Sequence, residues 1–200
     1  MGLSNLVRCF FVLTLLVTPA LLAGCVGGSD AMTTHPTVFV DESFDAFLPD
    51  VVAGLRSWPG VVPDVVTVSR EDVLALARTA EPNTVYLVRS STVDQVGCPW
   101  AGHDSNLGGE AAVTHPLAGL TCVAADYVAQ HPALDGGESA MRRAVAHEFG
   151  HELGLRFDNA ADPHHYPGGG RLMSADYYGP DAPAEEDLAA LRARFPELAR

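Results

Sequence analysis

Lysine is absent from this chain of 200 residues, and all 12 of its basic residues are arginine. They stand against 25 acidic residues, so the formal net charge is −13 at pH 7. A nucleic-acid-binding protein needs a concentrated basic patch, and a protein that binds anionic lipid surfaces needs a polybasic segment. The composition therefore argues against both kinds of partner, and we expect no nucleic acid to bind.

Long apolar runs are also missing, apart from a short one near the N-terminus. It spans residues 9–17, follows the single charge of Arg8 and is cut short by Pro19. A membrane-spanning helix needs about 20 apolar residues, whereas a short apolar run behind a positive charge is typical of a secretory signal. We therefore predict that residues 1–24 are an export signal; an uncleaved membrane anchor is the alternative.

The apolar run is followed by Leu22-Ala23-Gly24-Cys25, which resembles the lipobox of bacterial lipoproteins. The resemblance implies that Cys25 carries a lipid and that the protein is anchored to the bacterial cell membrane, facing outside. The alternative is an ordinary cleavage site at which Cys25 has no role. Residues 25–36 have the composition of a flexible tether. The rest, residues 37–200, has the length of one domain, which we expect to be a monomer.

Cysteine is scarce, and only four are present. Cys9 belongs to the predicted signal and Cys25 to the lipobox, which leaves Cys98 and Cys122 in a chain bound for an oxidising compartment. We predict a disulfide between them, worth about 3 kcal/mol for a loop of this length. Two free thiols are the alternative.

The first half of the domain alternates between strand and helix patterns. Apolar residues at helical spacing occupy residues 44–58, and Pro49 must then lie in the first turn of the helix, or the helix begins there. Ser69 with Asp72 resembles a capping box that opens a second helix ending near Ala80. Strand patterns occupy residues 37–40, 65–68 and 84–89. This alternation predicts a β-α-β-α-β arrangement with parallel strands.

The second half is richer in Gly, Ser, His and Pro, with strand patterns near residues 111–114 and 121–128. Asp135 and Glu138 are candidate caps of a helix that runs to about Gly154, and a last helix begins near Pro183. The predicted class is α+β, with an α/β-like first half.

The helix before Gly154 carries the residues with the clearest chemistry. His147 and His151 are four residues apart, so both imidazoles lie on one face, where they can share a metal. Glu148 lies beside them, where a general base for a metal-bound water belongs. The opposite face is apolar and anchors the helix; it consists of Met141, Val145, Phe149 and Leu153. A helix with surface histidines and no metal is the alternative.

The segment HEFGHELGL, followed by RLMSADYYG, resembles the metzincin metallopeptidases, in particular their matrixin-like branch. The matches are His147, Glu148, His151 and Gly154 in the helix motif, and Met173 in the Met-turn. The resemblance implies a twisted mixed sheet with an active-site helix, a Met-turn and a C-terminal helix. It further implies a Zn²⁺-dependent endopeptidase that hydrolyses extracellular proteins or peptides through a zinc-bound water activated by Glu148.

One position departs from the family pattern, because Phe157 stands where the third zinc ligand is expected and cannot bind zinc. We predict Asp158 as the third ligand, with His164 or His165 as the alternatives. The departure leaves two other hypotheses open. One is a catalytically inactive metzincin-fold lipoprotein that serves as a binding module. The other is a different zincin class whose third ligand is a distant glutamate, Glu185 or Glu186.

Overall fold

The computed structural model describes residues 31–90, 112–115, 119–125, 128, 139–174 and 180–199. The predicted signal, Cys25 and Cys98 lie outside these residues. Export, lipidation and the Cys98–Cys122 disulfide therefore stay predictions. Among the described residues, no helix combines the length and the apolar character needed to cross a membrane.

Five strands form one sheet in the order β2-β1-β3-β5-β4. Neighbouring strands are parallel except at the β4–β5 pair, which is antiparallel and places β4 at an edge. The mixed sheet agrees with the predicted α+β class, and the first three predicted strands are correct to within one residue. The strands are β1 Thr37–Asp41, β2 Asp64–Val68, β3 Thr84–Ser90, β4 Ala112–His115 and β5 Leu120–Ala124.

The two helices of the first half begin where the sequence predicts, and both end a few residues earlier. Residues 42–55 form a 3-10 helix, η2 (Glu42–Phe47), which is kinked at Asp45 by a positive φ of 38°, and then helix α1 (Leu48–Leu55), whose first turn contains Pro49 as predicted. Helix α2 (Arg70–Ala77) begins, as predicted, where the Ser69 side chain accepts a hydrogen bond from the Asp72 N–H. It ends before the predicted Ala80, which has a φ of 47°.

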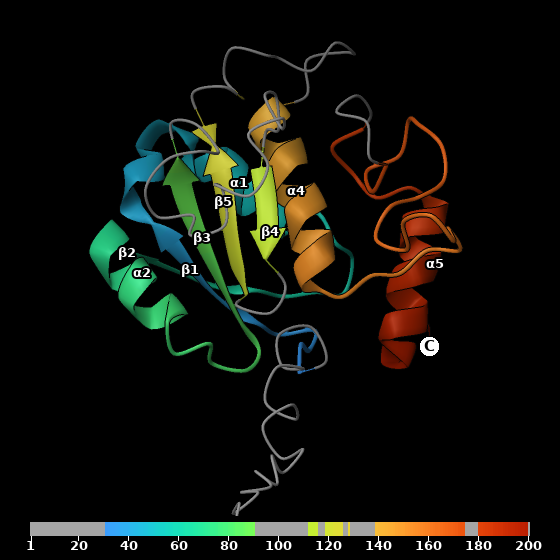
Figure 1. Cartoon of the computed structure of the whole chain (residues 1–200), viewed down its shortest axis with the longest axis horizontal. Helices are drawn as coiled ribbons and strands as arrows, with labels where there is room; N and C mark the ends of the chain where they lie inside the picture. The colour runs from blue at the N-terminus through green and yellow to red at the C-terminus, as the bar shows by residue number, and fades with distance from the viewer. Residues whose placement is uncertain are drawn as a thin grey trace, which may run out of the picture.

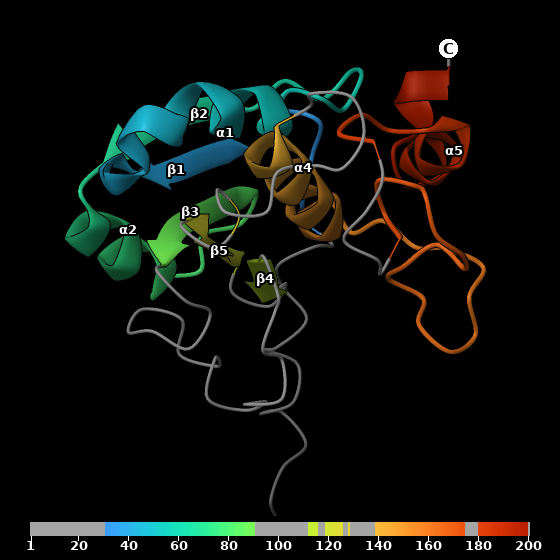
Figure 2. The same ribbon diagram turned by 90° about the horizontal axis from the view of Figure 1, so that it is seen from above.

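The helices cover both faces of the sheet (Figures 1 and 2). Helices α1 and α4 (Ala140–Glu152) lie on one face and α2 lies on the other. Alternate side chains of the central strand β3 point to opposite faces of the sheet. Val85 and Leu87 belong to the core beneath α1 and α4, whereas Tyr86 and Val88 pack with α2. The sheet thus supplies a rigid support for α4, the helix that carries the His-Glu-x-x-His motif.

Helix α4 is held at both ends by local interactions. The Ser139 side chain caps it by accepting a hydrogen bond from the Arg142 N–H at 3.2 Å, whereas the predicted caps Asp135 and Glu138 lie outside the described residues. At the other end Gly154 has a φ of 75° and stops the helix as predicted. The apolar stripe is buried in the core, as predicted; its members are Met141, Val145, Phe149 and Leu153.

The C-terminal part lies beyond α4 and contains α5 (Glu185–Arg194) and a short 3-10 helix, η3 (Pro196–Ala199) (Figure 1). Helix α5 begins two residues after the predicted Pro183. Arg194 donates to the Met32 carbonyl at 3.5 Å, and both Met32 and Thr34 are buried. Within the described residues, packing against the domain therefore reaches back to Met32, inside the segment predicted as tether.

Candidate metal centre

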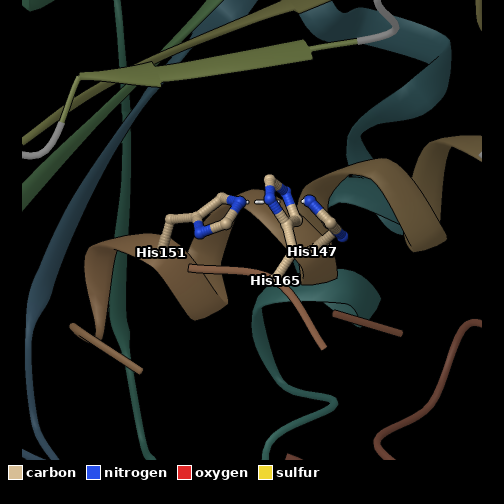
Figure 3. Close-up of side chains that lie close together, drawn as sticks. All are labelled: His147, His151 and His165. Carbon is tan, nitrogen blue, oxygen red and sulfur yellow. Dashed lines mark hydrogen bonds between the residues drawn. The ribbon is translucent and has the colours of Figure 1, made fainter. Parts of the chain in front are cut away.

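Three histidines converge at the C-terminal end of α4. His147 and His151 come from successive turns of the helix and His165 from the loop that follows it (Figure 3). One ligand atom from each residue lies within 4.8 Å of the other two, so the three are close enough to bind one metal ion. They are the single such group among the residues that the structure describes.

The spacing of the imidazole nitrogens fits shared coordination. The Nε2 atoms of His147 and His151 are 3.1 Å apart. Two nitrogens bound at about 2.0–2.1 Å to a tetrahedral ion are separated by about 3.3 Å. The His165 ring centroid lies 5.3 Å from that of His147 and 4.9 Å from that of His151. The helical pair thus needs little movement to hold an ion, and His165 supplies a third donor beside it.

Hydrogen bonds at the far side of two rings fix their orientation. The Nδ1–H of His147 donates to the Leu172 carbonyl at 2.6 Å, and the Nδ1–H of His165 donates to a carboxylate oxygen of Asp162, also at 2.6 Å. Each bond leaves Nε2 as the nitrogen with a lone pair for a metal. Metal-binding histidines commonly have such a carbonyl or carboxylate partner.

Burial keeps the helical histidines uncharged. Desolvation lowers the pKa of His147 to about 4 and that of His151 well below its usual value, and neighbouring histidines add to the effect on His151. A neutral imidazole is the form that binds metal. At neutral pH a metal therefore competes with no proton at these two positions.

The loop after α4 is closed on itself, and this closure brings His165 back to the helix. The Phe157 N–H donates to the Pro163 carbonyl at 2.9 Å, and the Asn159 side-chain amide donates to the His165 carbonyl at 3.1 Å. The Phe157 ring packs edge-on against Tyr166 and against the core. Phe157, which occupies the expected ligand position, is therefore a packing residue of the loop that carries His165.

Asp158, the predicted third ligand, is exposed and does not belong to the metal-binding group. The structure places His165, one of the two alternatives, beside the helical pair. Phe157 turns inward, and its neighbour Asp158 lies on the solvent side of the loop. The other alternative, His164, accepts a hydrogen bond from Arg156 at 2.7 Å.

The distant glutamates are occupied elsewhere. Glu186 pairs with Arg171 at 2.8 Å, and Glu185 pairs with Arg192. Neither belongs to the group of three histidines, so the structure gives no support to a distant glutamate ligand.

Glu148 is buried between α4 and the edge strand β4. Burial raises its pKa to about 7, although hydrogen bonds from the Thr114 hydroxyl and backbone N–H to its carboxyl oppose the shift. Its electrostatic interaction with His165 also opposes the shift. A carboxyl with this pKa can both accept and release a proton near neutral pH.

Met173 lies fully buried beneath the motif helix. A Cβ placed on Gly150 would be 2.4 Å from the Met173 sulfur, so the glycine of the motif allows this close packing. The neighbouring Leu172 carbonyl holds His147, and the Met173 carbonyl accepts a hydrogen bond from the Tyr166 N–H at 2.8 Å. The Met173 segment thus contacts both sources of ligands, the helix and the loop.

The sequence analysis did not single out Asp162, Glu152 or Thr121. The position of Asp162, three residues before His165, is a local signal for a carboxylate–histidine pair. Glu152 is completely buried and accepts a hydrogen bond from the Thr121 hydroxyl at 3.0 Å. Its burial raises its pKa to about 8. No sequence signal marks it, because a glutamate at a helix end is usually exposed.

Comparison with known proteins returns no match: no family model, curated protein or solved structure is significantly similar to the chain.

Proposed function

We propose that the protein is a zinc-dependent metalloendopeptidase. The observation that carries the proposal is the convergence of His147, His151 and His165 beside the buried carboxyl of Glu148. Three imidazoles suit zinc well, and three protein ligands leave a coordination position open, as in catalytic zinc sites. When bound, zinc would supply Lewis-acid chemistry, polarising a carbonyl and lowering the pKa of water to about 7.

Glu148 is the general base and acid in this proposal. As a carboxylate it accepts a proton from water that attacks the scissile carbonyl, and it then delivers the proton to the leaving amine. A pKa of about 7 suits both roles near neutral pH. The hydroxyl and backbone N–H of Thr114 hydrogen-bond this carboxyl and lower its pKa against the larger effect of burial.

The order of elements supports the resemblance to metzincins. A mixed sheet precedes the helix that carries the motif, and the buried Met173 segment and α5 follow it. The proposed third ligand departs from the family pattern, since His165 lies in the loop eight residues after Phe157, which occupies the position of the family's third ligand. We propose a metzincin-like enzyme with a displaced third ligand.

The likeness of residues 22–25 to a lipobox supports export and attachment to the outer face of a bacterial membrane through Cys25. The substrates would then be extracellular proteins or peptides.

The first test is hydrolysis of casein or gelatin by residues 26–200, with zinc content measured on the same sample. We expect one zinc per chain and chelator-sensitive cleavage. Glu148→Gln should retain zinc and lose activity by at least 10²-fold, because general base catalysis contributes 10²–10⁴-fold in enzymes. Glu185→Gln, at an exposed acid of α5, is the control and should behave like wild type.

Chelator-insensitive cleavage, or full activity in Glu148→Gln, would contradict the proposed mechanism. Stoichiometric zinc without hydrolysis of any protein substrate would instead favour a binding lipoprotein.

A further inference from the structure

Arg156 follows the end of the metal-binding helix and begins the loop that carries His165. Its two neighbours in the chain, Leu155 and Phe157, both pack in the core. The Leu155 N–H also donates to the Gly150 carbonyl of α4 at 3.2 Å. The backbone on either side of Arg156 is therefore held in place, while the Arg156 side chain itself is exposed to solvent.

His164 connects Arg156 to the metal centre. A guanidinium N–H of Arg156 donates to the Nε2 atom of His164 at 2.7 Å. The His164 ring lies edge-on to the ring of His151, with 6.1 Å between the two centroids. The backbone N–H of His164 is held by Asp162 at 3.1 Å. A single imidazole ring thus separates the guanidinium from one of the metal-binding histidines.

The charge of Arg156 is not matched by a carboxylate in the part of the chain that the structure describes. Arg142, Arg171 and Arg192 form ion pairs with acidic side chains, whereas Arg156 donates to an imidazole. A guanidinium has five N–H groups, so donors remain after the bond to His164. Guanidinium groups bind carboxylates through two parallel hydrogen bonds. Arg156 can therefore accept a carboxylate from outside the chain.

A bound peptide would bring side chains within reach of this arginine. The proposed reaction places the scissile carbonyl at an ion held by His147, His151 and His165. Successive residues of an extended peptide are about 3.3 Å apart. A side chain one or two residues from the scissile bond can therefore extend past the ring of His164 to the guanidinium of Arg156.

We propose that Arg156 is a specificity-determining residue which binds a carboxylate of the substrate close to the scissile bond. The carboxylate comes from an acidic side chain or from the C-terminus of the peptide, and His164 holds the guanidinium in place to receive it. The inference rests on the proposed function, because it names the substrate class of the same site.

The test is cleavage of matched peptides by zinc-loaded protein of residues 26–200. The peptides are acetylated and amidated, and each position around the scissile bond is in turn Glu, Gln or Lys. At one position we expect kcat/KM to be about fivefold higher for Glu than for Gln, the upper range for an ion pair that stays in contact with water. A Gln peptide with a free C-terminus is the second arm, and a preference for it alone would assign the carboxylate to the end of the substrate.

Variants of Arg156 show whether the preference comes from this side chain. Arg156→Gln should cleave the preferred carboxylate peptide and its uncharged counterpart at similar rates, and Arg156→Glu should favour Lys instead. Arg78→Gln is the control, because Arg78 is exposed and follows α2 on the other face of the sheet (Figures 1 and 2). The control should keep the fivefold preference. An undiminished preference in Arg156→Gln would overturn the inference, as would a wild type that prefers neither Glu at any position nor a free C-terminus.

A binding measurement separates this inference from the proposed function. Fluorescence anisotropy of the same peptides, labelled with a dye, is measured with saturating zinc in Glu148→Gln, which should bind them without cleaving them. We expect the carboxylate peptide to bind about fivefold more tightly than its uncharged counterpart, and Arg156→Gln in the same background to remove the difference. If the wild type cleaves no peptide, the proposed function fails, and the dissociation constants still decide whether Arg156 recognises a carboxylate. Equal constants, or no binding of either peptide, would overturn the inference even in an active enzyme.

Discussion

At the scale of the residue, the His165–Asp162 pair accounts for the position of the proposed third ligand, His165. The bond to His165 lowers the pKa of Asp162 and is the largest contribution to that shift, so the carboxylate is ionised when it accepts the imidazole N–H. Asp162 also accepts the His164 N–H at 3.1 Å. The Asp162 side chain thus orients the imidazole ring of His165 and also holds the backbone of the preceding residue, His164.

This pair leads to a prediction on metal affinity. We expect Asp162→Asn to weaken zinc binding by 10–100-fold, the usual effect of losing an outer partner of a metal ligand. His165→Ala should weaken it further, because a donor atom itself is lost. Asp158→Asn should bind zinc like wild type, since Asp158 is exposed on the same loop. Competition with a chromophoric chelator measures all three, and a weakened Asp158→Asn with a normal His165→Ala would restore Asp158 as the ligand.

The residues of the site differ in how well the sequence reveals them. Helical spacing marks His147, Glu148 and His151, because residues four apart lie next to each other on one face of a helix. His165 has no such periodic signal. Its position depends on the contacts of Phe157 and Asn159 with residues later in the loop, and these contacts form only in the folded chain. Sequence alone could therefore name His165 as a candidate but could not choose it over Asp158.

At the scale of the element, the close packing of α4 on the Met173 segment depends on the glycine at position 150, which has no side chain. A Cβ on Gly150 would meet the Met173 sulfur at 2.4 Å and Trp58 at 2.9 Å. Trp58 is itself fixed, because its indole N–H donates to the Ala146 carbonyl at 3.0 Å. The helix therefore has little room to accept a larger residue at this position.

We accordingly expect Gly150→Ala to destabilise the protein by about 1–3 kcal/mol, the cost of overpacking a core. Alanine gains about 1 kcal/mol of helix propensity over glycine, and a clash at 2.4 Å outweighs this gain. Urea unfolding measures the change. In a Met173→Ala background, which removes the sulfur, the same substitution should cost less; an equal cost would show that Met173 is not the obstacle.

The elements themselves follow closely from the sequence where the pattern is long and regular. Apolar runs predict the positions of strands β1, β2 and β3. The alternation of these strands with helices predicts their parallel pairing. Helix ends and kinks are less predictable, because they depend on single backbone angles, such as that of Ala80 after α2 and that of Asp45 inside η2. The order of strands, with antiparallel β4 at the edge, arises from long-range pairing that no local pattern records.

At the scale of the whole molecule, metal-free folding must bury four titratable groups of α4 in their neutral forms. Burial raises the pKa of Glu152 to about 8 and that of Glu148 to about 7, both from 4.5. Above pH 4.5 the unfolded chain has lost these protons and the folded chain keeps them, so the free energy of unfolding falls as the pH rises. His147 acts in the opposite direction, because its pKa is lowered from 6.5 to about 4 and folding becomes less favourable as the pH falls through that range.

The two effects oppose each other below pH 6.5, and only the carboxyl effect operates between pH 6.5 and about 8. In this upper range we expect the metal-free protein to lose roughly 2 kcal/mol of unfolding free energy through Glu152 alone, since one proton changes stability by about 1.4 kcal/mol per pH unit. Glu152→Gln has no proton to lose and should show a clearly smaller fall, whereas Glu185→Gln, at an exposed site, should follow wild type. Urea unfolding of zinc-free protein across this range measures the slopes. Equal slopes in wild type and Glu152→Gln would mean that Glu152 is already ionised in the folded protein, with a partner that stabilises its charge.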